Sequence, residues 1–170
     1  VTLISGPTKL SLEHPNLNLI RITTAEELLT QVKEFWPKSD IGVFSAAVAD
    51  YRPKEIASQK IKKNSSEISI ELVKNPDVLA WAGENKSASQ LLVGFALETN
   101  NLEENGKLKL EKKNLNFIVL NTLQDSGAGF GVDTNKINIL DNHNNLTSFE
   151  LKSKAEVASD IVDYAKKYHS

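Results

Sequence analysis

The strongest constraint on the fold of this chain is a set of short apolar runs separated by segments of helical length. The runs Ile41–Ala47, Leu91–Ala96 and Phe117–Leu120 show no polar alternation, which is typical of strands buried on both faces of a sheet. Strands that alternate with helices along a chain favour a parallel sheet covered by helices. The sequence therefore predicts an α/β fold.

The segments around these runs extend the alternation. Thr24–Glu27 has the Thr-x-x-Glu spacing of a capping box, so we expect a helix that begins there and stops at Pro37. Asn75–Asp77 combines a cap, a proline and an acidic residue, which predicts a helix start with Asn75 as the cap. Further strands are expected at residues 1–5, 19–22, 68–72, 136–141 and 146–151, and further helices at residues 102–114 and 154–168. Together they predict a Rossmann-like, mostly parallel sheet with helices on both faces and an added antiparallel hairpin.

Composition restricts the class of partner. A chain of 170 residues predicts one domain, residues 1–170, and a net charge of −2 argues against nucleic acid or an anionic membrane as the partner. No apolar run approaches the roughly 20 residues of a membrane span. The absence of cysteine fits a reducing compartment, so we expect a cytoplasmic location. The chain has no methionine and starts with residues of strand character, so we expect it to begin inside a larger protein.

Polar residues follow the three buried strands at the point where each strand ends. Asp50–Arg52 comes after the first strand, Glu98–Asn100 after the second and Asn121 after the third. The carboxyl ends of parallel strands line up along one edge of a sheet, and ligands bind beyond that edge. We therefore expect these residues to converge on one ligand site.

Two features near this edge carry charge. Asp50 reads either as a turn carboxylate that caps backbone N–H groups or as an acceptor for a base amino group or Mg²⁺. Lys60 begins a run with Lys62 and Lys63, which is either a solvated loop or a flap that closes over phosphates. The position of the run ten residues after Asp50 favours the flap.

Other candidates have alternatives that the residues alone leave open. Pro76 and Asp77 belong to a helix start that either is a plain cap or attracts anions and polar base edges. Lys109 and Lys113 share one helical face, which is a solvated face or an anion site. Phe95 follows Gly94 and is either a core residue or a flat surface for a nucleobase. The three histidines, His14, His143 and His169, have no metal-ligand spacing, and we assign them no role.

Assembled in order, these segments resemble the phosphopantothenoylcysteine synthetases, the ligases of coenzyme A biosynthesis. The resemblance spans nearly the whole chain, and the pair AAVADYRP and KIKK is specific to this family. The matching segments are Val1–Thr8, Thr24–Leu28, Ser45–Pro53, Lys60–Lys63, Lys74–Leu79, Val93–Asn101 and Gly129–Asn135.

The resemblance implies a CTP-dependent amide ligation that joins 4′-phosphopantothenate to L-cysteine through an acyl-cytidylate. It implies Mg²⁺ with the triphosphate, ligands unknown, and a homodimer. It implies that Lys60 is the catalytic lysine of the flap. The family's nucleotide-binding positions match Ala46, Asp50, Lys60, Pro76, Asp77, Val78, Leu79, Phe95, Lys109 and Lys113.

The sequence departs from the family in two places. The family begins one β-α unit earlier, with a glycine-rich turn and a loop of the form SNxSSGxMG, and the loss of that unit should leave apolar sheet surface exposed. Leu97 stands where many relatives have alanine. Two alternatives therefore stay open beside the ligase: a nucleotide-binding module without catalysis and a dimerisation fragment. A further variant is the use of ATP in place of CTP.

Overall fold

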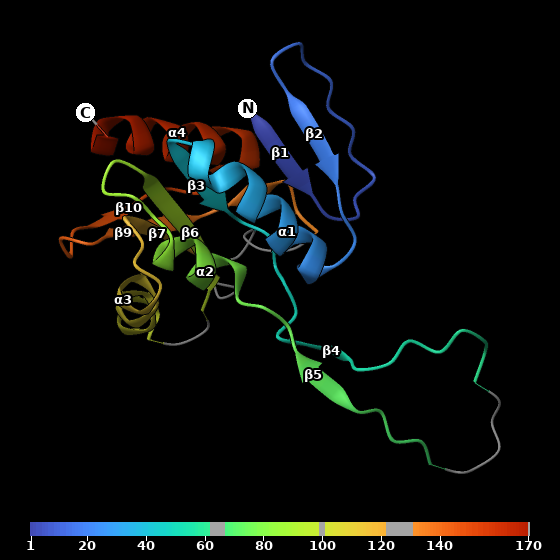
Figure 1. Cartoon of the computed structure of the whole chain (residues 1–170). Coiled ribbons are helices and arrows are strands. Elements are labelled where there is room, and N and C mark those ends of the chain that lie inside the picture. The colour runs from blue at the N-terminus through green and yellow to red at the C-terminus, as the bar shows by residue number, and fades with distance from the viewer. Residues whose placement is uncertain (62–66, 99–100, 122–130, 170) are drawn as a thin grey trace. The chain divides into compact units, whose positions relative to one another are not determined.

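The computed structural model describes residues 1–61, 67–98, 101–121 and 131–169. The chain divides into two compact units that alternate along the sequence. Unit 1 comprises Val1–Lys33 and Ala47–Val78, and unit 2 comprises Glu34–Ala46 and Leu79–Ser170. Figure 1 gives the order of the elements, and each unit is described by itself below.

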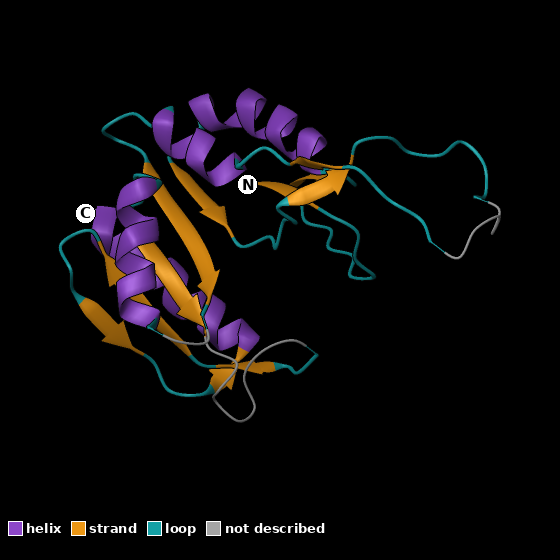
Figure 2. Cartoon of the chain, turned by 90° about the horizontal axis from the view of Figure 1, so that it is seen from below, coloured by secondary structure: helices purple, strands orange, loops and turns teal. Residues whose placement is uncertain are grey.

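Unit 2 is built on a five-stranded sheet with the strand order β10-β9-β7-β6-β3. The strands β3 (Ile41–Phe44), β6 (Leu91–Leu97) and β7 (Phe117–Asn121) are parallel to one another. The last two, β9 (Ile137–Asp141) and β10 (Leu146–Ser148), form an antiparallel hairpin on β7. This confirms the predicted parallel sheet with an added hairpin (Figure 2).

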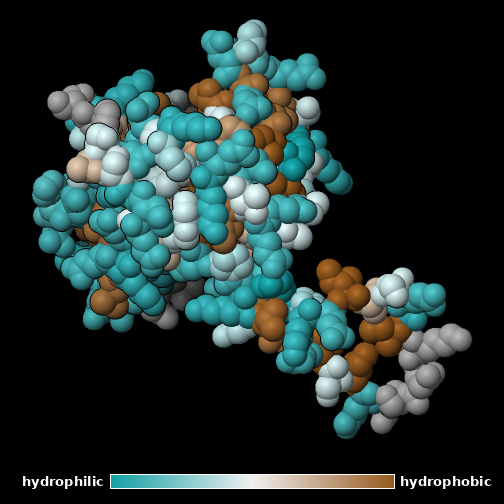
Figure 3. All heavy atoms as spheres, viewed as in Figure 1, coloured by the Kyte–Doolittle hydropathy of each residue, from teal (hydrophilic) through white to brown (hydrophobic). Residues whose placement is uncertain are grey.

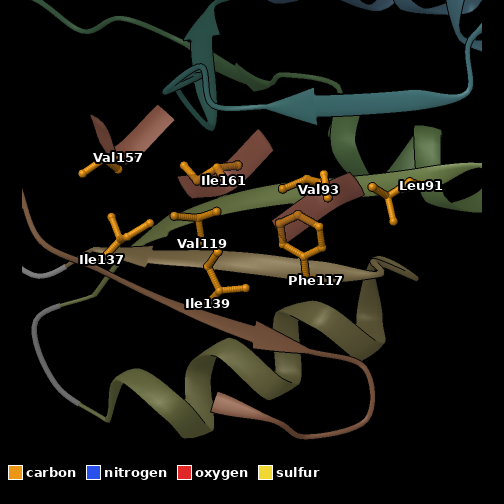
Figure 4. Close-up of a cluster of buried hydrophobic side chains, with 9 residues drawn as sticks. Leu91, Val93, Phe117, Val119, Ile137, Ile139, Val157 and Ile161 are labelled. Carbon is orange, nitrogen blue, oxygen red and sulfur yellow. The ribbon is translucent and has the colours of Figure 1, made fainter. Parts of the chain in front are cut away.

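The core of unit 2 lies between this sheet and helix α4 (Lys154–His169). Alternate residues of β6, β7 and β9 point toward α4, as Figure 4 shows for the labelled side chains. Helix α3 (Leu102–Lys112) packs on the opposite face against β7 and β9. The cluster consists of Leu91, Val93, Phe117, Val119, Ile137, Ile139, Val157, Ile161 and Ala165.

The strand β3 corrects one expectation. We predicted that residues 41–47 form a strand buried on both faces, but β3 ends at Phe44 and lies at the edge of the sheet. Within the described sheet only β6 pairs with it, so Ile41 and Val43 remain 41% and 50% exposed.

Unit 1 contains two small sheets and most of helix α1 (Ala25–Phe35). The strands β1 (Thr2–Ser5) and β2 (Asn18–Arg21) pair in parallel. The predicted capping box is confirmed, because the Glu27 N–H donates to Thr24 Oγ1 at 3.1 Å and the Glu27 carboxylate accepts from the Thr24 N–H at 3.2 Å. Hydrogen bonds from Thr23 and Thr24 hold the pKa of Glu27 below its ordinary value.

The second sheet of unit 1 is the base of a long hairpin arm. The strands β4 (Tyr51–Pro53) and β5 (Leu72–Lys74) pair antiparallel, and the described part of the arm beyond them is residues 54–61 and 67–71 (Figure 1). The strand expected at residues 68–72 is therefore only in part correct. Ile68 and Ile70 are 63% and 61% exposed. Within unit 1, the alternating isoleucines of this segment therefore do not form a buried face.

Three short elements were not predicted from the sequence pattern. A 3₁₀ turn η1 (Trp36–Lys38) follows α1, and β8 (Thr134–Asn135) pairs with β11 (Lys152–Ser153). Helix α3 ends two residues before the expected end, since Asn114 has a left-handed φ of 50°. None of the helices in the described ranges combines the length and apolar composition that a membrane crossing requires.

The turn between β9 and β10 depends on the buried carboxylate of Asp141. It accepts hydrogen bonds from the backbone N–H groups of His143 and Asn145, both at 2.9 Å, from the Asn145 amide and from the Tyr164 hydroxyl. Burial raises the pKa of Asp141, but these hydrogen bonds outweigh burial and bring the pKa below its ordinary value. The ionised carboxylate therefore stabilises the fold.

We expect Asp141→Asn to lower the free energy of unfolding at pH 7 by about 1–3 kcal/mol, because an amide cannot accept all four bonds. The stabilisation by the parent carboxylate is present above the ordinary pKa of 3.8 and is lost as the pH falls through the lower folded value. Urea unfolding at several pH values should therefore show the difference between parent and variant shrinking in acid. Asp163→Asn, at an exposed surface ion pair, is the control, and equal stability of Asp141→Asn and parent at pH 7 would contradict the assignment.

Candidate functional site

In unit 1 the base of the arm brings two of the predicted nucleotide-binding segments together. Tyr51 pairs with Lys74, so Asp50 and Asn75 meet just outside the paired strands. The Asn75 N–H donates to the Asp50 carbonyl at 2.8 Å, and the Asn75 amide donates to the Ala49 carbonyl at 2.8 Å. Asp50 therefore lies beside the segment that continues into Pro76 and Asp77.

The same contacts correct the predicted role of Asn75. Helix α2 (Val78–Glu84) begins at Val78, so its N-cap position is Asp77 and Asn75 lies two residues too early. The Asn75 side chain is used instead to join the two segments at the base of the arm. Asp77 directly precedes the helix and is exposed, and Val78 is buried.

Arg52 occupies the centre of this base. Its Nη1 donates to the Lys74 carbonyl at 2.9 Å and to Asn75 Oδ1 at 3.2 Å, and its Nη2 forms an ion pair with Glu26 of α1. The prediction placed Arg52 at the ligand edge without a role. The structure shows that its guanidinium contacts two other segments of unit 1, residues 74–75 and helix α1.

Lys60 lies farther out on the arm and is exposed. The part of the arm that leads to residue 61 runs away from the paired strands (Figure 1). The rest of the predicted flap, Lys62 and Lys63, lies outside the described residues. The structure thus places Lys60 on the arm but does not bring it next to Asp50, and its role stays a prediction.

In unit 2, two of the predicted strand ends converge. The Glu98 N–H donates to the Asn121 carbonyl at 3.0 Å, so the ends of β6 and β7 meet at one edge of the sheet. Ala46 follows β3 and is exposed. Thr99 and Asn100 of the second strand end lie outside the described residues.

Phe95 and Leu79 lie on opposite faces of β6. A side chain at Gly94 would reach the Leu115 and Leu79 methyl groups at 2.8 and 3.0 Å, so Leu79 of α2 fills the face above Gly94. Phe95 is partly buried and packs against the core cluster on the other face. The core alternative for Phe95 therefore holds for much of its ring, while part of the side chain is still exposed.

Lys109 and Lys113 have different surroundings. Lys109 Nζ forms an ion pair with Glu98 Oε1 at 2.5 Å, and Asn105 donates to Glu98 Oε2 at 2.9 Å. Lys113 is the C-cap of α3, and its N–H donates to the Lys109 carbonyl at 3.0 Å. Sequence reasoning noted Glu98 only as a strand end and missed that its carboxylate holds Lys109 at the edge of the sheet.

The described residues contain no group of three or more side chains arranged to hold a metal ion by themselves. Mg²⁺ commonly binds through one or two carboxylates and the phosphates of a nucleotide, so such a group is not required. The exposed carboxylate of Asp50 in unit 1 is an oxygen donor of the right kind and is compatible with a magnesium–nucleotide complex. In unit 2 the Glu98 carboxylate is only 12% exposed and already binds Lys109 and Asn105.

The fold is α/β, and the ends of the parallel strands β6 and β7 meet at one edge of the sheet. Residues 1–168 match the family model of the DNA/pantothenate metabolism flavoprotein C-terminal domain. The chain belongs to this family.

Two curated relatives are similar to this chain. A protein from an unknown prokaryotic organism, named cysteine/cysteine sulfinic acid decarboxylase, is 46% identical over 95% of this chain and 45% of its own length. The coenzyme A biosynthesis bifunctional protein CoaBC of Haemophilus influenzae is 42% identical over 96% of this chain and 40% of its own length. The chain thus spans less than half the length of these relatives.

Solved structures share the fold. The crystal structure of the C-terminal domain of a coenzyme A biosynthesis bifunctional protein CoaBC has a TM-score of 0.79 at 32% identity and covers 98% of this chain and 72% of its own. A more distant structure, the Cab2 mutant H337A in complex with phosphopantothenate-cysteine, has a TM-score of 0.64 at 18% identity. It covers 89% of this chain and 54% of its own, and shows the fold alone.

Proposed function

We propose that this chain is the major part of a phosphopantothenate–cysteine ligase that uses CTP in coenzyme A biosynthesis. The observation that carries the proposal is the base of the arm, where Asp50 lies beside Pro76 and Asp77 in a member of this family. The name of the CoaBC relative, which is 42% identical to this chain, supports the pathway. We also propose a cytoplasmic location for the protein.

The proposed reaction has two steps. The carboxylate of 4′-phosphopantothenate attacks the α-phosphorus of CTP, which forms an acyl-cytidylate and releases pyrophosphate. The amine of L-cysteine then attacks the acyl carbon, an amide bond forms, CMP leaves and the amine loses a proton. Bound Mg²⁺ would neutralise phosphate charge on the nucleotide.

The residues divide this work according to their chemistry. In unit 1, Asp50 and the exposed start of α2 at Asp77 recognise polar groups of the nucleotide, and Lys60 supplies positive charge where the acyl transfer develops negative charge. In unit 2, Lys109 and Lys113 carry positive charge for the phosphates. The ion pair of Lys109 with Glu98 sets the position of that charge before a nucleotide arrives.

We expect Asp50→Asn to raise the dissociation constant for Mg-CTP about tenfold, because the exposed side chain would keep its shape but lose its charge. Isothermal titration calorimetry measures the change, and the melting temperature should not move. Asp40→Asn is the matched control, since this exposed aspartate lies in unit 2 and precedes β3. Equal affinity of Asp50→Asn and parent would remove Asp50 from the site.

Turnover tests the proposed reaction. The chain is mixed with 4′-phosphopantothenate, L-cysteine and Mg-CTP, and the products are followed by mass spectrometry and a pyrophosphate assay. The proposal predicts equal amounts of pyrophosphate, CMP and phosphopantothenoylcysteine. CTP binding without any of these products would favour a nucleotide-binding module without catalysis, and product formed equally well with ATP would contradict the use of CTP.

We further propose that the protein is a homodimer joined through the arm. The arm exposes a series of large apolar side chains, which Figure 3 shows as brown spheres, and four of its isoleucines line a cavity of about 370 Å³. The described charged residues of the arm beyond β4 and β5 are Lys54, Glu55, Lys60, Glu67 and Glu71, so a second copy of the arm offers charges of the opposite sign. The exposed apolar residues are Tyr51, Ile56, Ile61, Ile68, Ile70 and Leu72.

A double substitution, Ile56→Glu with Ile70→Glu, is expected to give a monomer in analytical ultracentrifugation, because four buried carboxylates per dimer would cost more than the apolar contact contributes. Leu108→Glu is the matched control, since Leu108 is 61% exposed on α3 of unit 2 and should not affect association. A parent that is monomeric at all concentrations, or a double variant that remains dimeric, would contradict the arm as the interface.

A further inference from the structure

We infer that Arg52 and Asn75 form a clasp that positions the nucleotide-binding segments of unit 1 relative to each other. The segments are Asp50, which precedes β4, and Pro76–Asp77, which follows β5. The inference rests on the proposed function, because it assigns to the clasp an effect on nucleotide binding. It adds two residues that the family resemblance did not bring into the site.

The clasp is a continuous series of hydrogen bonds. Arg52 Nη1 bridges the Lys74 carbonyl and Asn75 Oδ1, at 2.9 and 3.2 Å. The other end of the same Asn75 amide donates to the Ala49 carbonyl at 2.8 Å, and its backbone N–H donates to the Asp50 carbonyl at 2.8 Å. The backbone on both sides of the candidate site is thereby joined through one asparagine, which is itself held by one arginine.

The pairing of the strands alone would hold these segments weakly. Only three residue pairs connect β4 and β5, and one of them contains Pro53, which has no N–H to donate. A two-stranded hairpin is marginally stable in water. Because Asp50 and Asp77 lie just outside the last pair, their separation depends on the contacts that close this end of the hairpin.

An arginine suits this position for a geometric reason. Its planar guanidinium donates in several fixed directions at once, so Arg52 contacts the Lys74 carbonyl, Asn75 and Glu26 together. A lysine would keep the ion pair with Glu26 but could not maintain the same set of directed bonds. The Arg52 side chain is 35% exposed, so its substitution leaves no deeply buried cavity.

The test is a double-mutant cycle on the affinity for Mg-CTP, measured by calorimetry on the full chain. We expect Arg52→Lys and Asn75→Ala each to raise the dissociation constant about tenfold. Because both act through the same series of bonds, the double variant should also lose about tenfold, not about a hundredfold. In turnover, Arg52→Lys should raise the KM for CTP with kcat within about twofold of the parent, because it does not replace Lys60.

Lys54→Ala is the matched control. Lys54 lies two residues beyond Arg52, just after the end of β4, and its Nζ pairs with Glu71 Oε1 at 2.8 Å on the surface. The Lys54→Ala substitution should leave unchanged both the affinity for CTP and the energetic coupling between Arg52 and Asn75. Thermal melts verify that each variant is folded. Hydrogen exchange of the Asn75 backbone N–H, which donates to the Asp50 carbonyl, reports the clasp directly in the absence of nucleotide, and faster exchange is expected in Arg52→Lys.

The outcomes separate this inference from the proposed function. If the parent binds Mg-CTP and Arg52→Lys binds it equally well, the clasp does not position the site, while the proposed function stands. If the losses of Arg52→Lys and Asn75→Ala multiply, the two residues act independently and the clasp is wrong. If the parent does not bind Mg-CTP at all, the proposed function fails, and the inference fails with it.

Discussion

Replacement of Gly83 by alanine is expected to lower the melting temperature by roughly 4–8 °C, a net loss of about 2 kcal/mol. An alanine methyl group at Gly83 would lie 1.9 Å from the backbone oxygen of Lys113, so either α2 or the end of α3 must move. That movement also strains the hydrogen bond from the Asn114 amide to the Gly83 carbonyl at 2.9 Å. Helix propensity alone predicts the opposite sign, a gain of about 1 kcal/mol for alanine, so thermal unfolding decides between packing and propensity.

Gly6→Ala is the control for this experiment. A methyl group at Gly6 meets no atom within 4 Å, so this substitution should change the melting temperature by less than about 2 °C. A Gly83→Ala variant as stable as the parent would show that α2 and α3 do not approach each other this closely. It would also weaken the positions assigned here to Leu79 and Lys113, which these two elements carry.

Replacement of Lys60 by glutamine is expected to reduce kcat about a hundredfold while the melting temperature stays unchanged. The side chain is exposed, so folding does not depend on it, whereas the proposed reaction loses a positive charge at the reacting phosphate. Steady-state turnover with saturating 4′-phosphopantothenate, Mg-CTP and L-cysteine measures the effect. Single-turnover release of pyrophosphate then shows whether the first or the second step is slowed.

The arm itself provides the comparison for Lys60. Lys54→Gln removes a positive charge from the same hairpin, and its surface pair with Glu71 contributes little to stability, so turnover should be unaffected. A similar loss for both variants would mean that the total charge of the arm matters and not Lys60 in particular. Unchanged turnover in Lys60→Gln would remove the flap role altogether.

The sequence predicted best those elements whose residues are buried on both faces. The strands β6 and β7 follow from their uninterrupted apolar runs, because no surface position requires a polar residue there. The same pattern was misleading for β3, which lies at the sheet edge and remains partly exposed. A run of apolar residues shows that a strand could be buried on both faces. The position of the strand in the sheet determines how much of its surface is covered.

The site was predictable as a set of segments but not as a set of contacts. Asp50 and Pro76–Asp77 were found from their local patterns, whereas the pairing of Tyr51 with Lys74 joins residues more than twenty positions apart. Asn75 looked like a helix cap because its neighbours are those of a cap, yet Arg52 and Ala49 are its partners in the fold. The contact between Glu98 and Lys109 also needs the relative position of β6 and α3, which periodicity does not provide.

The measurement that tests the central claim most directly is calorimetric titration of this chain with Mg-CTP, with Mg-ATP as the comparison. The account predicts saturable binding of Mg-CTP at one site per chain, with Mg-ATP bound at least about tenfold more weakly, a difference of roughly 1.4 kcal/mol. Binding of neither nucleotide, or equal binding of both, would contradict the proposal that this chain carries a site selective for CTP.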